Sequence, residues 1–144
     1  MLKLKIKRCH PLAQVPKYMT SGAACFDVTV VETVTLLPSE VRVMRTGLCF
    51  EIPEGWEMQV RQRSGISRAF PNYIANAPGT IDSDYRGELF ILTVNNTDVD
   101  FFIQEGVRFA QCKLQRVERL PIEVVEELSD TERGSGAFGH TGMG

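Results

Sequence analysis

The chain has 144 residues, of which 43% are hydrophobic and 24% are charged, and its formal net charge is −2. These values are ordinary for one globular domain with a core of its own. The small charge excludes general attraction to nucleic acid or to an anionic membrane as the basis of function. No apolar run approaches the roughly 20 residues of a membrane span, and the N-terminus lacks the apolar core of a signal peptide. We therefore expect a cytoplasmic protein.

The four cysteines, Cys9, Cys25, Cys49 and Cys112, lie far apart and form no Cys-x-x-Cys pair of the kind that binds zinc. Three of them lie in apolar, strand-like stretches, where a reduced cysteine behaves as a small hydrophobic residue. We expect neither a metal site nor a disulfide from them.

The first segments of the chain alternate in polarity. Residues 2–7 alternate leucine or isoleucine with lysine, which predicts a half-buried strand with one face covered by lysines. Pro11 and Pro16 then break the chain into a loop. The apolar run 21–30 is interrupted by Asp27, and burying an unpaired carboxylate is costly. Asp27 is therefore a candidate functional or bracing residue.

The middle of the chain consists of short alternating segments. Residues 41–45 and 56–61 alternate, and turn residues separate the strands at 38–40 and 53–55. Short strands and frequent turns without a long amphipathic helix predict an all-β fold, an antiparallel sandwich or barrel. We expect only a short helical turn, over 67–70.

The next segment, Arg63-Ser64-Gly65, combines features suited to binding an oxyanion. The guanidinium is a planar fork of donors, the serine adds a hydroxyl, and the glycine allows close approach of a backbone N–H group. Alone, this tripeptide is a weak signal.

Residues 76–88 predict a tight β-hairpin, because Pro78 and Gly79 open a turn and a strand follows at 89–94. A purely structural hairpin does not need the polar side chains that this segment carries. Backbone groups on a rigid hairpin can read the polar edge of a flat ligand, with Asp82 and Tyr85 placed to reach its sugar and a water molecule.

The remaining strands are predicted at 101–103, 107–114 and 122–128. Gln111 carries an amide that can hold a metal-bound water. The segment 129–144 holds five glycines and cannot bury enough apolar surface to remain ordered alone. We therefore divide the chain into a β-core, residues 1–128, and a flexible arm, residues 129–144.

Residues 79–87, Gly-Thr-Ile-Asp-Ser-Asp-Tyr-Arg-Gly, closely resemble the third motif of the trimeric dUTPase family. Four further segments resemble its other motifs in the expected order: Asp27 with its neighbours, Arg63-Ser64-Gly65, residues 106–111 and residues 133–142. This sequence departs from the family pattern at Cys25, Gln62, Val107, Ala137 and His140.

The resemblance implies a distorted jelly-roll or β-sandwich-like subunit, a β-clip fold, in a homotrimer with active sites shared between chains. It implies hydrolysis of dUTP to dUMP and pyrophosphate with Mg²⁺, which keeps uracil out of DNA and supplies dUMP for dTMP synthesis. One chain would supply Arg63, Ser64, Gly65 and Gln111 to the phosphates, a second the hairpin, and a third the arm.

Individual roles also follow from the resemblance. Asp82 would orient and deprotonate the attacking water, and Tyr85 would pack on the deoxyribose. Asp27 would act near the metal through water or serve as a structural brace, and we leave both roles open. The uracil contacts would come from Asn76, Gly79, Thr80 and Ile81, with a backbone contact from Phe90. The arm contacts would come from Arg133, Phe138, Gly139, His140 and Thr141.

Two other functions fit parts of the sequence. The first is dCTP deamination on the same fold, alone or combined with dUTP hydrolysis. The second is a non-enzymatic, nucleotide-gated interaction protein whose arm becomes ordered on dUTP and recruits a partner. Product analysis distinguishes these alternatives.

Overall fold

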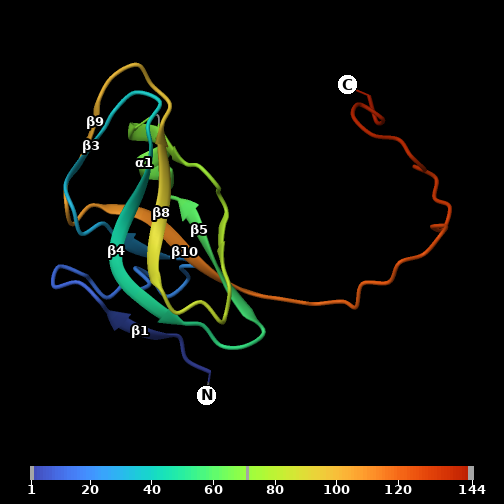
Figure 1. Ribbon diagram of the computed structural model, residues 1–144, viewed down its shortest axis with the longest axis horizontal. Helices are drawn as coiled ribbons and strands as arrows, with labels where there is room; N and C mark the ends of the chain where they lie inside the picture. Colours follow the sequence, from blue (N-terminus) through green and yellow to red (C-terminus); the bar gives the residue numbers. More distant parts are fainter. Residues whose placement is uncertain (1, 71, 143–144) are drawn as a thin grey trace.

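The computed structural model describes residues 2–70 and 72–142. The described chain folds into short strands and one six-residue helix, and Figure 1 shows their arrangement. In chain order the elements are β1 (Lys5–Arg8), β2 (Phe26–Thr29), β3 (Val34–Leu36), β4 (Val41–Glu51), β5 (Trp56–Gln62), α1 (Ser64–Ala69), β6 (Asn72–Ile74), β7 (Gly79–Ile81), β8 (Glu88–Asn95), β9 (Phe101–Ile103) and β10 (Arg108–Arg116).

The strands form two four-stranded sheets and one small pair. The first sheet has the order β1-β4-β8-β6, the second has the order β2-β10-β5-β7, and β3 pairs with β9. All of these pairings are antiparallel. The prediction of an all-β, jelly-roll-like fold is therefore confirmed.

The core lies between the two large sheets. Along β8, buried and less buried residues alternate strictly, as expected for a strand with one face on the core. The fully buried side chains come from both sheets and include Met44, Leu48, Met58, Leu89 and Ile91, together with Leu36 of the β3–β9 pair. Cys112 is buried in β10, and this burial raises the pKa of its thiol to about 12.

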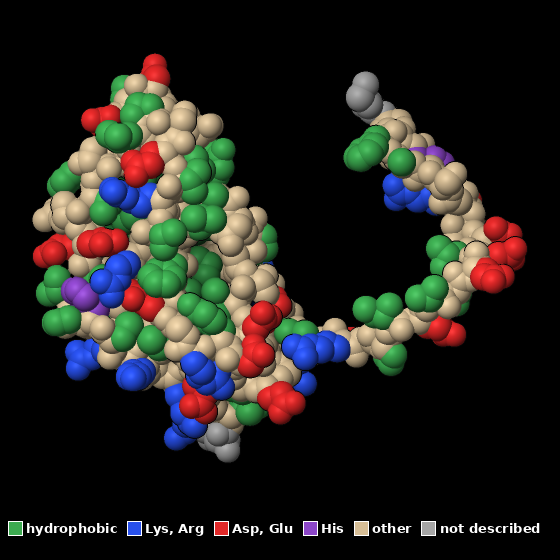
Figure 2. Space-filling view, viewed as in Figure 1, with side chains coloured by type: hydrophobic (Ala, Val, Ile, Leu, Met, Phe, Trp, Pro, Cys, Tyr) green, Lys and Arg blue, Asp and Glu red, His purple; other side chains and the backbone are tan. Residues whose placement is uncertain are grey.

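The other face of the first sheet is apolar but uncovered in the single chain. Val41, Val43, Tyr73 and Phe90 are each 44–57% exposed, and they come from β4, β6 and β8. Figure 2 shows hydrophobic side chains gathered over β4 and β8, the strands nearest the viewer in Figure 1. We call these four residues the outer apolar face.

Residues 76–88 do not form the predicted hairpin. β7 pairs with β5 in the second sheet, whereas β8 pairs with β4 and β6 in the first. The turn residues at 82–87 therefore carry the chain from one sheet to the other. The turn residues predicted the reversal of the chain correctly, but β7 and β8 do not pair with each other. They belong to different sheets, and each packs one face on the core between the sheets.

The chain after β10 leaves the folded body. The last backbone contact to the body is the hydrogen bond from Val117 N to Gly55 O, 3.0 Å long. The predicted strand over 122–128 is wrong for the single chain: its residues are exposed, with Ile122 97% and Val124 95% exposed. Figure 1 shows this segment and the arm lying away from the sheets, so no strand is available to pair with it.

Two smaller predictions differ little from the structure. The predicted helical turn is α1, which begins three residues earlier than expected, at Ser64. The N-terminal strand β1 pairs with β4 and exposes its lysines, and Lys5 Nζ lies 2.6 Å from Glu51 Oε1. Among the described residues, no helix is long and apolar enough to cross a membrane.

Candidate active site

One end of the second sheet brings together an acid and two arginines. Asp27 on β2 is contacted on one oxygen by Arg63 Nε, at 3.0 Å, and on the other by Arg108 Nη1, at 3.1 Å. Arg63 also donates to the backbone oxygen of Arg108 at 2.7 Å. This arginine cluster joins the ends of β2, β5 and β10, and thus connects three of the five motifs.

Gln111 lies beside the arginine cluster. Its Cα is paired with that of Asp27 on one side and that of Arg61 on the other. Its amide nitrogen donates to Gln62 O at 2.8 Å, which orients the side chain. The amide oxygen is then the acceptor that remains for a ligand or a water molecule.

The geometry bears on the two roles left open for Asp27. Both carboxylate oxygens face arginines, and the side chain is only 15% exposed. This arrangement favours the role of structural brace. The described residues include no cluster of three or more His, Cys, Asp and Glu side chains that could hold a metal ion. Mg²⁺ therefore fits this site only when phosphate oxygens and waters supply most of its ligands.

Ser64 and Gly65 lie at the start of α1, directly after Arg63. The helix has no side-chain cap at Arg63, so the N–H groups of its first turn are donors for another acceptor. A Cβ atom added to Gly65 would meet nothing within 4 Å of it. Packing inside this chain therefore does not require glycine at this position, whereas close approach of a ligand would.

Gly79, Thr80 and Ile81 form β7, at the edge of the second sheet, and Asn76 lies in the turn that precedes it. The Asn76 amide packs over Gly79, where an added Cβ would lie 3.2 Å from Asn76 Nδ2. As an edge strand, β7 has backbone groups on one side that no neighbouring strand of the chain satisfies. These groups are suited to binding the polar edge of a base.

The turn after β7 is held by its own backbone and side chains. Tyr85 N donates to Asp82 O at 3.2 Å, and Arg86 Nη1 donates to Ser83 O at 2.6 Å. The Tyr85 ring folds over Gly87, where an added Cβ would lie 2.6 Å from the ring carbon Cζ. Asp82 is exposed and makes no ion pair with the residues described.

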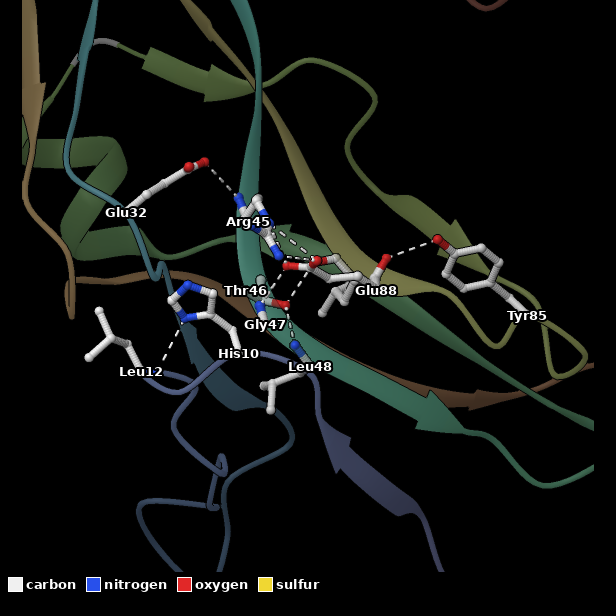
Figure 3. Close-up of polar contacts among 10 residues, drawn as sticks. His10, Leu12, Glu32, Arg45, Thr46, Gly47, Leu48, Tyr85 and Glu88 are labelled. Atoms are coloured by element: carbon white, nitrogen blue, oxygen red, sulfur yellow. Dashed lines mark hydrogen bonds and ion pairs between the residues drawn. The ribbon is translucent and has the colours of Figure 1, made fainter.

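Arg45 and Glu88 form a second ion pair beside this turn (Figure 3). Arg45 donates from Nε and Nη2 to the Glu88 carboxylate, at 2.9–3.2 Å, and Gly47 N donates to the same carboxylate at 2.8 Å. Burial acts to raise the pKa of Glu88, but the hydrogen bonds from Arg45 and Gly47 outweigh it and hold the pKa below its usual value. The hydrogen bond to Glu88 raises the pKa of Arg45.

Arg63 and Asp82 lie at opposite ends of β5. Ile81 pairs with Met58, so Asp82 lies one residue beyond Met58 and Arg63 five residues away in the other direction. Six strand steps of about 3.3 Å place the two backbones about 20 Å apart. Within one chain, the arginine cluster and Asp82 are therefore too far apart to act on neighbouring phosphates.

The arm residues are not brought to either region. Arg133 Nε donates to Gly136 O at 2.9 Å, and the His140 ring lies against Gly136, so both make contacts only within the arm. Phe138 is fully exposed, and Gly139 and Thr141 follow it in the exposed arm. Phe90 lies on the outer apolar face. The substrate contacts of these residues remain predictions.

The sequence patterns predicted no role for Arg108, Arg45 or Glu88. Arg108 lies inside the fourth motif, and the need of Asp27 for a cation was the signal that could have identified it. Arg45 and Glu88 are 43 residues apart, and no local pattern connects them.

Cationic groups at one end of a sheet and a free edge strand beside a fixed turn are features expected of a nucleotide-binding β protein. The dUTPase family profile matches residues 12–142. The deoxyuridine 5'-triphosphate nucleotidohydrolase of Nautilia profundicola is 47% identical over 141 residues, covering 98% of this chain and 99% of its own. That of Helicobacter pylori strain P12 is 42% identical over 142 residues, with 99% and 98% covered. The chain belongs to the dUTPase family.

Solved structures agree with this assignment. The Staphylococcus bacteriophage 80alpha dUTPase with dUpNHpp superimposes with a TM-score of 0.93 at 27% identity, covering 99% of this chain and 100% of that chain. A mutant dUTPase of phage phi11 of S. aureus, described with a structural Mg(II) ion, has a TM-score of 0.83 at 26% identity, covering 90% and 100%.

Proposed function

We propose that this protein is a dUTP diphosphatase that hydrolyses dUTP to dUMP and pyrophosphate. The observation that carries the proposal is the Asp82 carboxylate, which is exposed and unpaired within the described chain and is held on a fixed turn beside an edge strand. An unpaired carboxylate on a rigid support can accept a proton from a water molecule. General-base help of this kind is worth about 10²–10⁴-fold, so other groups must supply the rest.

The other groups act on the triphosphate. Arg63, the Ser64 hydroxyl and the first N–H groups of α1 would neutralise and align the phosphate oxygens. Mg²⁺ would be held by the phosphates and by waters, and it would withdraw charge from the phosphoryl oxygens. Gln111 would orient a water at this end through its free amide oxygen. Asp27 would keep Arg63 in place.

The edge strand and the turn would select the nucleoside. Backbone groups of Gly79, Thr80 and Ile81, with the Asn76 amide, would pair with the uracil edge. A strand that lies against the ring leaves no space for a 5-methyl group. Tyr85, folded over Gly87, would pack on the deoxyribose and exclude a 2′-hydroxyl. We therefore expect dUTP to be preferred over dTTP, dCTP and UTP.

We propose that the protein acts as a homotrimer in which each site is shared between chains. The separation of about 20 Å between Arg63 and Asp82 supports this, because one chain cannot place both on one triphosphate. The outer apolar face supports it as well, since exposed apolar patches mark interaction surfaces. The exposed segment 122–128 would pair with a strand of another chain.

We propose that the arm, residues 129–144, closes over the bound nucleotide. Its glycines give the backbone high entropy, so contacts with the ligand must drive its ordering. Phe138 would stack on uracil and Arg133 would pair with the γ-phosphate, while Gly139, His140 and Thr141 would contact the phosphates. The β-core up to residue 128 would remain folded without it.

The proposed reaction removes dUTP and supplies dUMP for dTMP synthesis, so we place the protein in the cytoplasm, where nucleotides are made. Its net charge of −2 gives no basis for direct binding to DNA.

The direct test is product analysis. The purified protein is incubated separately with dUTP, dTTP, dCTP and UTP, each with Mg²⁺ or with a chelator, and products are identified by chromatography. We expect dUMP and pyrophosphate from dUTP, with Mg²⁺ only. Release of dUDP and phosphate would contradict the proposed bond cleavage. A deaminated product from dCTP would support the deaminase, and nucleotide binding without turnover would support the interaction protein.

A further inference from the structure

Glu88 is the first residue of β8, directly after the turn over residues 82–87, which we call the Tyr85 turn. Its side-chain carboxylate binds Arg45 and Gly47, and its backbone oxygen accepts a 2.9 Å hydrogen bond from the Tyr85 hydroxyl. Figure 3 shows these contacts side by side. One residue thus connects the outer end of the tyrosine to strand β4.

The contact with β4 depends on an irregularity in that strand. The register between β4 and β8 shifts between Arg45 and Cys49. At the shift, Gly47 has a φ of +67°, and a Cβ there would lie 2.6 Å from His10 Cβ and 2.9 Å from Ala13 Cβ. Only glycine fits this conformation and this space. The displaced Gly47 N–H is satisfied by the Glu88 side chain instead of a strand carbonyl.

The bulge and the ion pair therefore fix Glu88 from two directions. Arg45 donates from two nitrogens to its carboxylate, and Gly47 donates to one of the same oxygens. The Glu88 side chain is 12% exposed, so water competes weakly for these contacts. Movement of Glu88 would move the acceptor of the Tyr85 hydroxyl.

We propose that Arg45 and Glu88 are positioning residues that hold the Tyr85 ring against the sugar and thereby determine the discrimination between dUTP and UTP. This inference rests on the proposed role of Tyr85 at the deoxyribose. Neither residue would touch the nucleotide itself. They act because a ring that tilts away from the sugar leaves room for a 2′-hydroxyl.

A second ion pair provides a matched control. Arg42 on β4 has its Nε 3.3 Å from Oε1 of Glu40, which lies just before that strand, and the two side chains are 41% and 27% exposed. No hydrogen bond in the described chain connects either side chain to the Tyr85 turn. If any ion pair of this sheet affected selectivity through stability alone, this pair would do so too.

The test compares kcat/KM for dUTP and for UTP, with the melting temperature of each variant. Arg45→Met keeps the apolar stem and removes the charge, Arg45→Lys restores a charge, Tyr85→Phe removes the hydroxyl, and Arg42→Met breaks the control pair. We expect Arg45→Met and Tyr85→Phe each to lower the dUTP-to-UTP ratio roughly three- to tenfold, the scale of one lost hydrogen bond. Arg45→Lys should recover part of the ratio, and Arg42→Met should leave it unchanged.

The double variant Arg45→Met with Tyr85→Phe should lose no more than Tyr85→Phe alone, because both substitutions break the same connection. An unchanged ratio in Arg45→Met, with or without a lower melting temperature, would overturn the inference. The proposed role of Tyr85 fails separately: it fails if the unmodified protein does not prefer dUTP, or if Tyr85→Ala keeps the preference. Loss of preference in Tyr85→Ala but not in Arg45→Met would refute only the present inference.

Discussion

A carboxylate lies near each end of β5, and the two acids have opposite surroundings. At one end, both oxygens of Asp27 face arginines, and its side chain is 15% exposed. At the other end, Asp82 is exposed and forms no ion pair with the described residues. Both lie in segments that resemble family motifs, so the motifs alone do not separate their roles.

The difference indicates which acid is available for chemistry. A carboxylate with two arginine partners is held in one orientation, and it stabilises the positions of those arginines. A carboxylate without a partner can accept a proton from water. The same residue type therefore supports a phosphate-binding corner at one end and serves as the proposed general base at the other.

The largest expected effect belongs to Asp82→Asn. Turnover of dUTP should fall about 10²–10⁴-fold, the range for loss of a general base. Binding of a non-hydrolysable dUTP analogue, measured by calorimetry, should be retained, and the melting temperature should not change because the side chain has no ion-pair partner to lose. Normal turnover in this variant would show that Asp82 is not the base.

Deletion of residues 133–144 should have the next largest effect. It removes Arg133 and Phe138, and base stacking on an aromatic ring alone is worth about 1–3 kcal/mol, or roughly 5- to 150-fold. The truncated protein should remain folded and trimeric by light scattering, since no strand of the core is touched. Phe138→Ala should show an intermediate loss. Full activity after truncation would mean that the arm does not close the site.

Asp27→Asn should mainly lower stability, in contrast to Asp82→Asn. Hydrogen bonds to charged groups contribute about 1.5–3 kcal/mol, and the substitution leaves Arg63 and Arg108 without their acid. The free energy of unfolding, measured by urea denaturation, should fall by about this amount. The exposed Asp98→Asn serves as control. A stable Asp27→Asn variant that needs a higher Mg²⁺ concentration for activity would instead assign Asp27 to the metal.

The smallest expected effect is the acid dependence of stability due to Glu88. Its pKa is lowered from 4.5 in the folded protein, so its contribution is present above pH 4.5 and is lost as the pH falls through the lowered value. The stability difference between the unmodified protein and Glu88→Gln should therefore shrink in acid. Melting temperatures from pH 6 to pH 3 provide the measurement, and a difference that is constant over this range would exclude the linkage.

Local patterns predicted the parts of this structure that depend on local sequence. The alternation in β5 and β8 predicted strands within one residue of their observed bounds, whereas β4 runs six residues beyond the predicted 41–45, and the glycine and proline residues around 76–88 predicted the reversal. The partner of β7 could not be predicted, because both sheets offer an edge to a short strand. The contact of Arg108 with Asp27 and that of Arg45 with Glu88 depend on strands distant in sequence.

The arm and the segment 122–128 illustrate a different limit. The alternation around Ile122 and Val124 predicts a strand that the single chain does not form, because a strand forms only where a neighbour accepts its hydrogen bonds. Among the residues that the structure describes there is no such neighbour, and the side chains remain exposed. A strand partner for this segment would depend on how several chains assemble, and the pattern of one chain does not show that.

The separation along β5 also has a consequence for mixtures of defective chains. If a nucleotide lies between the Arg63 end of one chain and the Asp82 end of another, each defect disables only the sites to which that chain lends the damaged end. Chains carrying Asp82→Asn and chains carrying Arg63→Ala would be inactive as separate preparations. Co-expressed, they would form some mixed assemblies in which an intact Asp82 meets an intact Arg63, and activity would return by complementation. A cell with one normal and one damaged copy would likewise lose activity gradually with the proportion of damaged chains.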